Sequence, residues 1–250
     1  MVFTMQDFVS IPLDDYLFQN KYPVGFTNRI LMLKMPVTQR QWREVMHEMP
    51  WDRVYDFNNG IGDDLPITLI SRHLVMDFCR KVSMQLGKSI RLPTEAEWEF
   101  GCRGGTSTHN YWGSDPAEYY DDRERLLNEA CFPYAIFKHH PDVRKVDGEI
   151  QLVPVGGRIP NAYGLYDMLG LVNEWVFDTI DTKQSDFVPD RKGLSVKKRS
   201  INHCSVDQDY CYVRGAGISS PRSYLRYDHG RMMTIDAGNH DIGFRVVLEL

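Results

Sequence analysis

The sequence of 250 residues lacks the features that mark several common classes of protein. It holds five cysteines, and no two of them form a CxxC pair, so neither a disulfide framework nor a zinc site is favoured. No stretch approaches the roughly 20 apolar residues that a membrane-spanning helix needs. The amino-terminal residues have no basic segment followed by an apolar run, which is the pattern of a secretory signal. We therefore expect a cytoplasmic protein without a membrane partner.

An excess of positive charge is also absent. Lysine and arginine total 29 against 34 aspartate and glutamate residues, which gives a formal net charge of −5. This balance provides no electrostatic attraction for a polyanion, so we expect no nucleic-acid partner. With 42% hydrophobic residues, the chain can bury a sizeable core in one domain.

Three segments carry signals for the start of a helix. Thr38 and Thr94 are each followed three residues later by Gln41 and Glu97, which is the spacing of a capping box. Ser71 precedes an apolar stripe at helical spacing and can act as a third cap. We expect helices to begin at these three positions.

The segment 89–105, SIRLPTEAEWEFGCRGG, has a structural task for almost every residue. Residues 90–92 are typical of a short strand that ends before Pro93. Glutamates then crowd the first turns of the helix, where the helix dipole favours negative charge. The glycine pair at 104–105 favours a left-handed carboxyl-terminal cap. Taken residue by residue, this pattern predicts a well-capped helix on the surface.

The remaining chain alternates short apolar runs with long polar segments. Residues 29–35, 173–177 and 212–214 are typical of strands, whereas residues 104–160 lose regular periodicity and favour loops. The polar residues 179–209 are typical of an inserted loop.

Taken as strings, RLPTEAEWEF at 91–100 and CRGG at 102–105 are matched by further motifs in a fixed order. These are PVT at 36–38, DFC at 77–79, YWG at 111–113, NAYGLYDM at 161–168, NEW at 173–175, VRG at 213–215 and GFR at 243–245. The set resembles the formylglycine-generating enzyme family, the sulfatase-modifying factors, from about Phe26 to the carboxyl terminus. The resemblance implies one α+β domain over residues 26–250 that is similar to the C-type lectin fold. Such a domain is loop-rich, with few helices and short twisted strands, and residues 1–25 would form a lead-in or an edge strand.

The resemblance also implies a chemistry that this chain lacks the residues to perform. The family's enzymes oxidise a substrate cysteine with two cysteines of their own, spaced five apart between Arg-Gly-Gly-Ser and Gly-Phe-Arg. Aligned from Arg214, those positions fall at Ser220 and Leu225. Leucine cannot ligate copper, and a serine hydroxyl is a poor substitute for a thiolate. We therefore expect no bound copper and no formylglycine formation, as in a pseudoenzyme.

A calcium site is the second feature that the resemblance implies. In the family, a Gly-Asn-Val-Trp-Glu-Trp segment helps to bind calcium, whereas this chain has Leu171 in place of the asparagine. Leucine offers no oxygen to a cation that takes six to eight oxygen ligands. Asn173 and Glu174 still carry oxygens, so a reorganised calcium site built on these two residues stays open as an alternative.

Relatives without the cysteines include the variable proteins of diversity-generating retroelements, which display variable residues just before Gly-Phe-Arg. This resemblance implies a ligand-binding surface within residues 217–241, where tyrosine and small polar side chains suit a protein ligand. The candidate binding residues are Ser219, Ser220, Ser223, Tyr224, Tyr227, Asp228, His229, Asp236, Asn239, His240 and Asp241. The alternative from the residues alone is an ordinary polar surface loop.

An enzymatic alternative remains within the superfamily. Some cysteine-free members act through nonheme iron, which needs histidine or carboxylate ligands that converge on one point. Asp228, His229 and His240 are the nearby candidates for such an oxidase or oxygenase. Neighbouring residues of a strand point to opposite faces, which weighs against Asp228 and His229 acting together.

Overall fold

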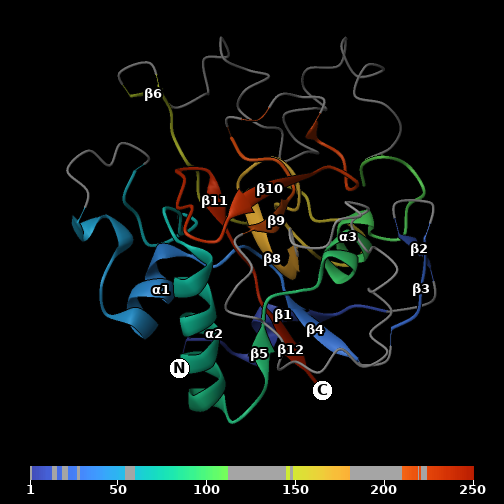
Figure 1. The fold of residues 1–250 in the computed structure, drawn as a ribbon, viewed down its shortest axis with the longest axis horizontal. Coiled ribbons are helices and arrows are strands. Elements are labelled where there is room, and N and C mark those ends of the chain that lie inside the picture. Colours follow the sequence, from blue (N-terminus) through green and yellow to red (C-terminus); the bar gives the residue numbers. More distant parts are fainter. Residues whose placement is uncertain are drawn as a thin grey trace.

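The structure is a computed structural model (Figure 1). It describes residues 2–12, 16–18, 22–26, 29–53, 60–111, 145–146, 149–180, 210–218, 220 and 224–250. Ser219, Ser223 and most of the inserted loop expected at 179–209 lie outside the described residues.

All three predicted helix starts are confirmed. Helix α1 (Gln39–Met46) is capped by Thr38, α2 (Arg72–Leu86) by Ser71 and α3 (Glu95–Arg103) by Thr94. The capping boxes at the starts of α1 and α3 are complete: the backbone nitrogen of Thr94, for example, donates to Glu97 Oε2 at 2.7 Å. Short 3-10 helices at Met5–Asp7 and Pro50–Arg53 accompany them. None of the described helices is long and apolar enough to cross a membrane.

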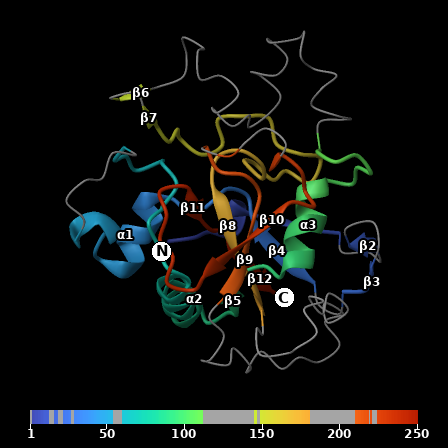
Figure 2. The ribbon, with the colours of Figure 1, turned by 45° about the horizontal axis from the view of Figure 1, so that its top comes forward.

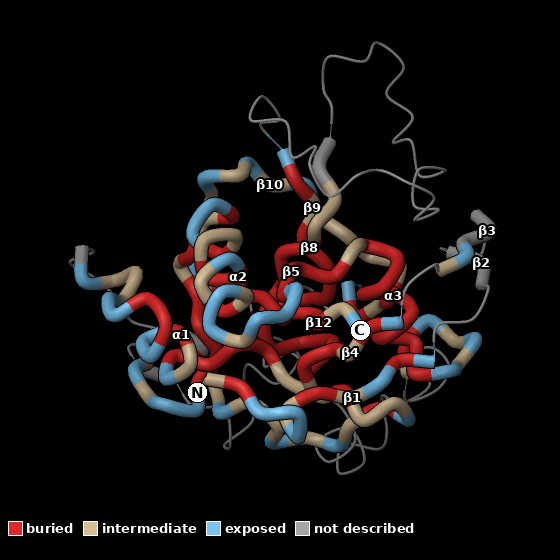
Figure 3. Tube along the Cα trace, turned by 90° about the horizontal axis from the view of Figure 1, so that it is seen from below, coloured by how far each residue is buried: buried red, intermediate tan, exposed pale blue. Residues whose placement is uncertain are grey.

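The first sheet joins both ends of the chain. Its strands run in the order β1 (Phe8–Ser10), β4 (Ile30–Leu33), β12 (Val247–Glu249) and β5 (Ile90–Arg91), and every neighbouring pair is antiparallel. β1 therefore forms an edge of this sheet, and the last strand of the chain lies in its middle. Figure 3 shows β4 and β12 within the buried part of the molecule.

The second sheet carries the carboxyl-terminal segment. Its order is β10 (Gly230–Thr234), β9 (Tyr210–Arg214), β8 (Asn173–Ile180) and β11 (Ile242–Gly243). β11 runs parallel to β8, whereas the other two pairs are antiparallel. Two further hairpins pair β2 (Tyr16–Phe18) with β3 (Tyr22–Val24) and β6 (Lys145–Val146) with β7 (Glu149–Ile150).

Apolar clusters lie on both sides of the second sheet. On one side, Trp42 of α1 stacks on Phe78 of α2 with ring centroids 5.5 Å apart, and Phe244 packs edge-on against both. On the other side, Trp98 of α3 belongs to a cluster that includes Val176 of β8. Figure 2 shows α1 and α2 on one side of β8 and β9, with α3 on the other. The expected α+β, loop-rich fold with few helices is confirmed.

The prediction that α3 is a surface helix is wrong, because every residue from Glu95 to Arg103 is buried. Its acidic side chains are neutralised by arginines from other elements. Arg91 donates to both carboxylate oxygens of Glu97, at 2.7 and 2.8 Å, and to Glu249 at 2.7 Å. Burial of a carboxylate is costly unless it is paired and hydrogen-bonded. Glu97 and Glu99 meet both conditions, and Glu95 is paired with Arg214 at 3.2 Å.

Candidate functional site

The two positions that correspond to the family's cysteines are both buried. Leu225 belongs to the apolar cluster that holds Trp98, Ala216 and Tyr227. Ser220 is 6% exposed, and its hydroxyl accepts a hydrogen bond from the backbone nitrogen of Gly217 at 3.0 Å. The leucine therefore contributes to core packing, and the serine closes a local turn. These residues do not fit a copper ion, which requires soft ligands.

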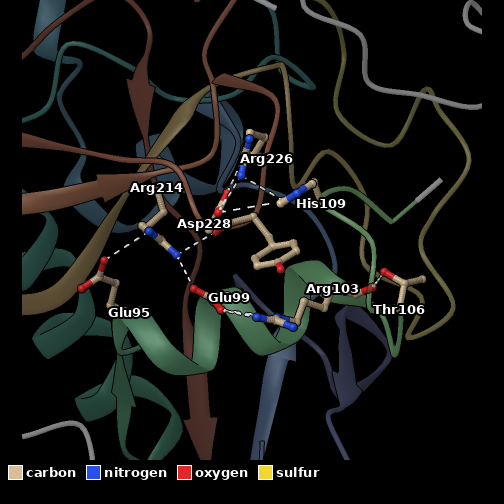
Figure 4. Close-up of polar contacts among 9 residues, drawn as sticks. Glu95, Glu99, Arg103, Thr106, His109, Arg214, Arg226 and Asp228 are labelled. Atoms are coloured by element: carbon tan, nitrogen blue, oxygen red, sulfur yellow. Dashed lines mark hydrogen bonds and ion pairs between the residues drawn. The ribbon is translucent and has the colours of Figure 1, made fainter. Parts of the chain in front are cut away.

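A buried network of ion pairs connects α3 and β9 with the loop around Tyr227 (Figure 4). Arg214 of β9 contacts Glu99 at 2.7 Å and Glu95 at 3.2 Å, and it donates to the backbone oxygen of Tyr227 at 2.7 Å. Arg103 donates to the other oxygen of Glu99 at 2.8 Å. The network joins α3 to the loop that follows Leu225, so it fixes the position of that loop.

Tyr227 is not available as a binding residue, because its side chain is buried. The guanidinium of Arg103 lies 3.9 Å from the centroid of the Tyr227 ring, in the geometry of a cation–π contact. The ring of His109 lies nearly parallel to the Tyr227 ring, with centroids 6.1 Å apart. The tyrosine thus anchors the loop to α3.

Asp241 is buried as well, and Asn173 donates to its carboxylate at 3.1 Å. Arg231 of β10 lies 3.7 Å from the same carboxylate. Three of the predicted binding residues are therefore buried supports of the segment 217–241: Ser220, Tyr227 and Asp241. A contact surface can be formed only by the candidates that are accessible to solvent.

The candidates that remain accessible begin with a stacked pair, in which Tyr224 is exposed and His229 is half-buried. The rings of Tyr224 and His229 lie 3.9 Å apart and nearly parallel. Burial and the nearby charge of Arg214 lower the pKa of His229, so its imidazole is mostly neutral at pH 7. The pair therefore presents an uncharged aromatic platform.

A second polar group, drawn in Figure 4, lies in the same segment of the chain. Arg226 holds Asp228 through two hydrogen bonds of 2.9 Å, and its Nη2 lies 3.0 Å from His109 Nδ1. Burial disfavours the charged carboxylate of Asp228, but the hydrogen bonds and charge of Arg226 outweigh it and lower the pKa of Asp228. His109 and Arg226 are not among the residues predicted for this surface, and no local pattern could link His109 to it, because His109 lies 117 residues from Arg226.

The remaining candidates lie after β10. Asp236, Asn239 and His240 are exposed, and Asp236 lies 3.6 Å from His73 of α2.

Asp228 is bound to Arg226 and His229 is stacked on Tyr224, so the oxidase ligands considered above do not converge. Among the described residues, no group of three or more histidine, cysteine, aspartate or glutamate side chains has the arrangement of a metal site.

The calcium alternative does not fit the geometry around Glu174. Both of its carboxylate oxygens accept hydrogen bonds from Arg245, each at 2.8 Å, and Trp98 donates to one of them at 2.7 Å. Asn173 is directed to Asp241 instead. A buried guanidinium thus neutralises the carboxylate that a calcium ion would need, and Leu171 is packed in an apolar cluster.

Comparisons with known proteins agree with this architecture. A family model described as "Sulfatase-modifying factor enzyme 1-like domain" matches residues 19–250. The chain is 30% identical over 155 residues to the formylglycine-generating enzyme of Mycobacterium tuberculosis, covering 56% of this chain and 44% of that protein. It is 28% identical over 226 residues to the "Inactive C-alpha-formylglycine-generating enzyme 2" of Bos taurus, covering 85% of this chain and 62% of that protein. The matches thus span less than two thirds of the length of these relatives.

Two solved structures share the fold over nearly the whole chain. "Treponema denticola variable protein 1" superposes with a TM-score of 0.70 at 20% identity and covers 97% of this chain and 95% of that chain. PvdO from Pseudomonas aeruginosa gives a TM-score of 0.68 at 20% identity and covers 97% and 90%. At such identities these likenesses establish the fold alone.

Proposed function

The chain belongs to the family of sulfatase-modifying factor enzyme 1-like domains, and we propose that it uses this scaffold as a non-catalytic ligand-binding protein. The observation that carries the proposal is the burial of Leu225 in the apolar core, at a position where the family's enzymes need a thiol. The name of the inactive bovine relative and the fold shared with a variable protein support the same reading.

The proposed binding surface consists of the exposed residues Tyr224, Asp236, Asn239 and His240 with the half-buried His229, and we call it the carboxyl-terminal surface. Tyrosine supplies rigid amphipathic area, and asparagine and aspartate supply adaptable hydrogen bonds, as in antibody paratopes. The stacked Tyr224 and His229 limit the side-chain entropy that binding would cost. A protein ligand suits such an open surface better than a small molecule, which requires a concave pocket.

The binding half of the proposal is tested by ligand selection from a display library of random linear peptides. Selected ligands are then titrated against the Tyr224→Ala variant and a Met84→Ala control. Met84 lies on α2 and is 73% exposed, so this substitution removes an apolar side chain outside the surface. We expect Tyr224→Ala to weaken binding about tenfold, as a hot-spot aromatic does. Ligands that lose no affinity in Tyr224→Ala would contradict the proposal.

The non-catalytic half is tested by elemental analysis of the purified protein. We expect no stoichiometric iron or copper. A retained transition metal that is lost in His229→Ala or His240→Ala would favour the metal-dependent oxidase instead.

A further inference from the structure

Strand β10 is an edge strand with few of the features that normally protect an edge. It pairs with β9 in a continuous register of five residues, from Gly230 opposite Arg214 to Thr234 opposite Tyr210. No other strand of the described residues pairs with its second side. The strand contains neither a proline nor a bulge, which are common devices against unwanted pairing. Figure 3 shows β10 at the periphery, coloured as intermediate and exposed.

One face of this edge is apolar. Met232 is 44% exposed and lies opposite Tyr212 of β9. Tyr210, which is 37% exposed, is diagonal to Met232 on the same face, within reach of a long side chain. Met232, Tyr212 and Tyr210 form an apolar strip across β10 and the neighbouring strand β9. A side chain added beside β10 on this face would cover the exposed part of Met232.

The opposite face of the edge carries a partly buried arginine. Arg231 alternates with Met232, so its side chain lies on the other face of the strand. That side chain is 39% exposed, and the Asp241 carboxylate at 3.7 Å is within ion-pair distance but beyond hydrogen-bond distance. The Nε and Nη2 atoms of Arg231 are buried, so this face of the strand is directed toward the protein and the Met232 face is the one left to a partner.

From these observations we infer that β10 is a docking edge for an extended segment of a partner protein, which adds to the second sheet as a further strand. The segment places an apolar side chain against Met232 and Tyr210. The backbone groups of an edge strand are complemented by another polypeptide backbone, which selects a peptide over a sugar or a nucleic acid. The inference rests on the proposed binding function, because β10 directly follows His229 of the carboxyl-terminal surface.

Peptides selected from the random linear library provide the probe. Each selected peptide is synthesised in two N-methylated forms, which block alternate backbone amides in the two possible registers. We expect one form to lose about 2 kcal/mol from two missing hydrogen bonds, or roughly thirtyfold in affinity, while the other form binds almost normally. Two forms that bind equally would overturn the inference.

Substitutions on the protein give the second readout. Met232→Lys places a charge on the apolar face and should weaken binding by at least about tenfold, whereas Met84→Lys on α2 should leave binding unchanged. Thr234→Lys, at an exposed position of the same face, serves as a second variant if Met232→Lys unfolds in a thermal melt. Binding that is sensitive to Tyr224→Ala but insensitive to both lysine variants would refute docking at β10 and leave the proposed function standing. Insensitivity to all of these changes would refute both.

Discussion

Replacement of Asp178 with asparagine should make the protein more stable at alkaline pH. Asp178 lies on β8 and accepts a hydrogen bond from the backbone nitrogen of Glu95, the first residue of α3. Burial and the negative charge of Glu95 raise the pKa of Asp178 to about 7. The carboxylate therefore tethers the helix start to the sheet, but its ionisation is disfavoured in the folded protein.

The sign of the pH dependence follows from this raised pKa. The folded protein holds the Asp178 proton more tightly than the unfolded chain, so the associated stability is fully present below pH 4 and is lost as the pH rises to about 7. A difference of about three pKa units corresponds to about 4 kcal/mol as an upper bound. Because the residue as a whole is only partly buried, we expect about 1 to 2 kcal/mol.

Asparagine has nearly the same shape and can accept the same hydrogen bond, but it does not ionise. Urea unfolding of the wild-type protein and Asp178→Asn should therefore give similar free energies at pH 4.5, and an advantage of about 1 to 2 kcal/mol for the variant at pH 8. Asp77→Asn on α2 serves as a control for removal of a more exposed acid. A stability difference that does not change with pH, or one that favours the wild type as pH rises, would refute the reasoning.

Four further experiments test other parts of the structure. Arg214→Met leaves Glu95 and Glu99 without this counter-charge and should cost about 3 to 5 kcal/mol in urea unfolding, so a loss below about 1 kcal/mol would argue against the network. Addition of calcium or a chelator should not shift the Tm, because Arg245 already neutralises Glu174. Bound calcium at a hundredfold excess over its Kd would add about 2.7 kcal/mol to the free energy of unfolding, and a stabilisation of that size would restore the calcium site. Thr94→Ala should lower the unfolding free energy by about 1 kcal/mol, and an unchanged value would disprove the capping role. Sequencing of the same locus in sibling strains tests diversification: differences clustered within residues 217–241 would support it, and differences spread evenly over the gene would reject it.

The parts of the fold that depend on near neighbours could be predicted from the sequence. The caps at Thr38, Ser71 and Thr94 each use a backbone partner three residues away, so their spacing is visible in the chain. The ordered family motifs then supplied the architecture that local patterns could not.

The burial of α3 could not be predicted in this way, because the arginine that pairs with both Glu95 and Glu99 comes from a distant strand. Arg214 is 115 residues from Glu99, and an acidic helix without its arginines has the pattern of a solvated one. Tyr227 was misplaced for the same reason, since the contact with Arg103 that buries it crosses between elements. Arg245 likewise pairs with Glu174 from 71 residues away, so the sequence did not show that the carboxylate expected to bind calcium is already neutralised.

The most direct test of the account is whether the chain converts cysteine to formylglycine. The purified protein is loaded with copper and incubated with a peptide that contains the sulfatase cysteine motif, beside the Streptomyces coelicolor formylglycine-generating enzyme as the positive control. Aldehyde in the peptide is measured by mass spectrometry. Because Ser220 and Leu225 occupy the cysteine positions and are buried, the account predicts no aldehyde above the enzyme-free background. Sustained turnover by this chain would contradict it.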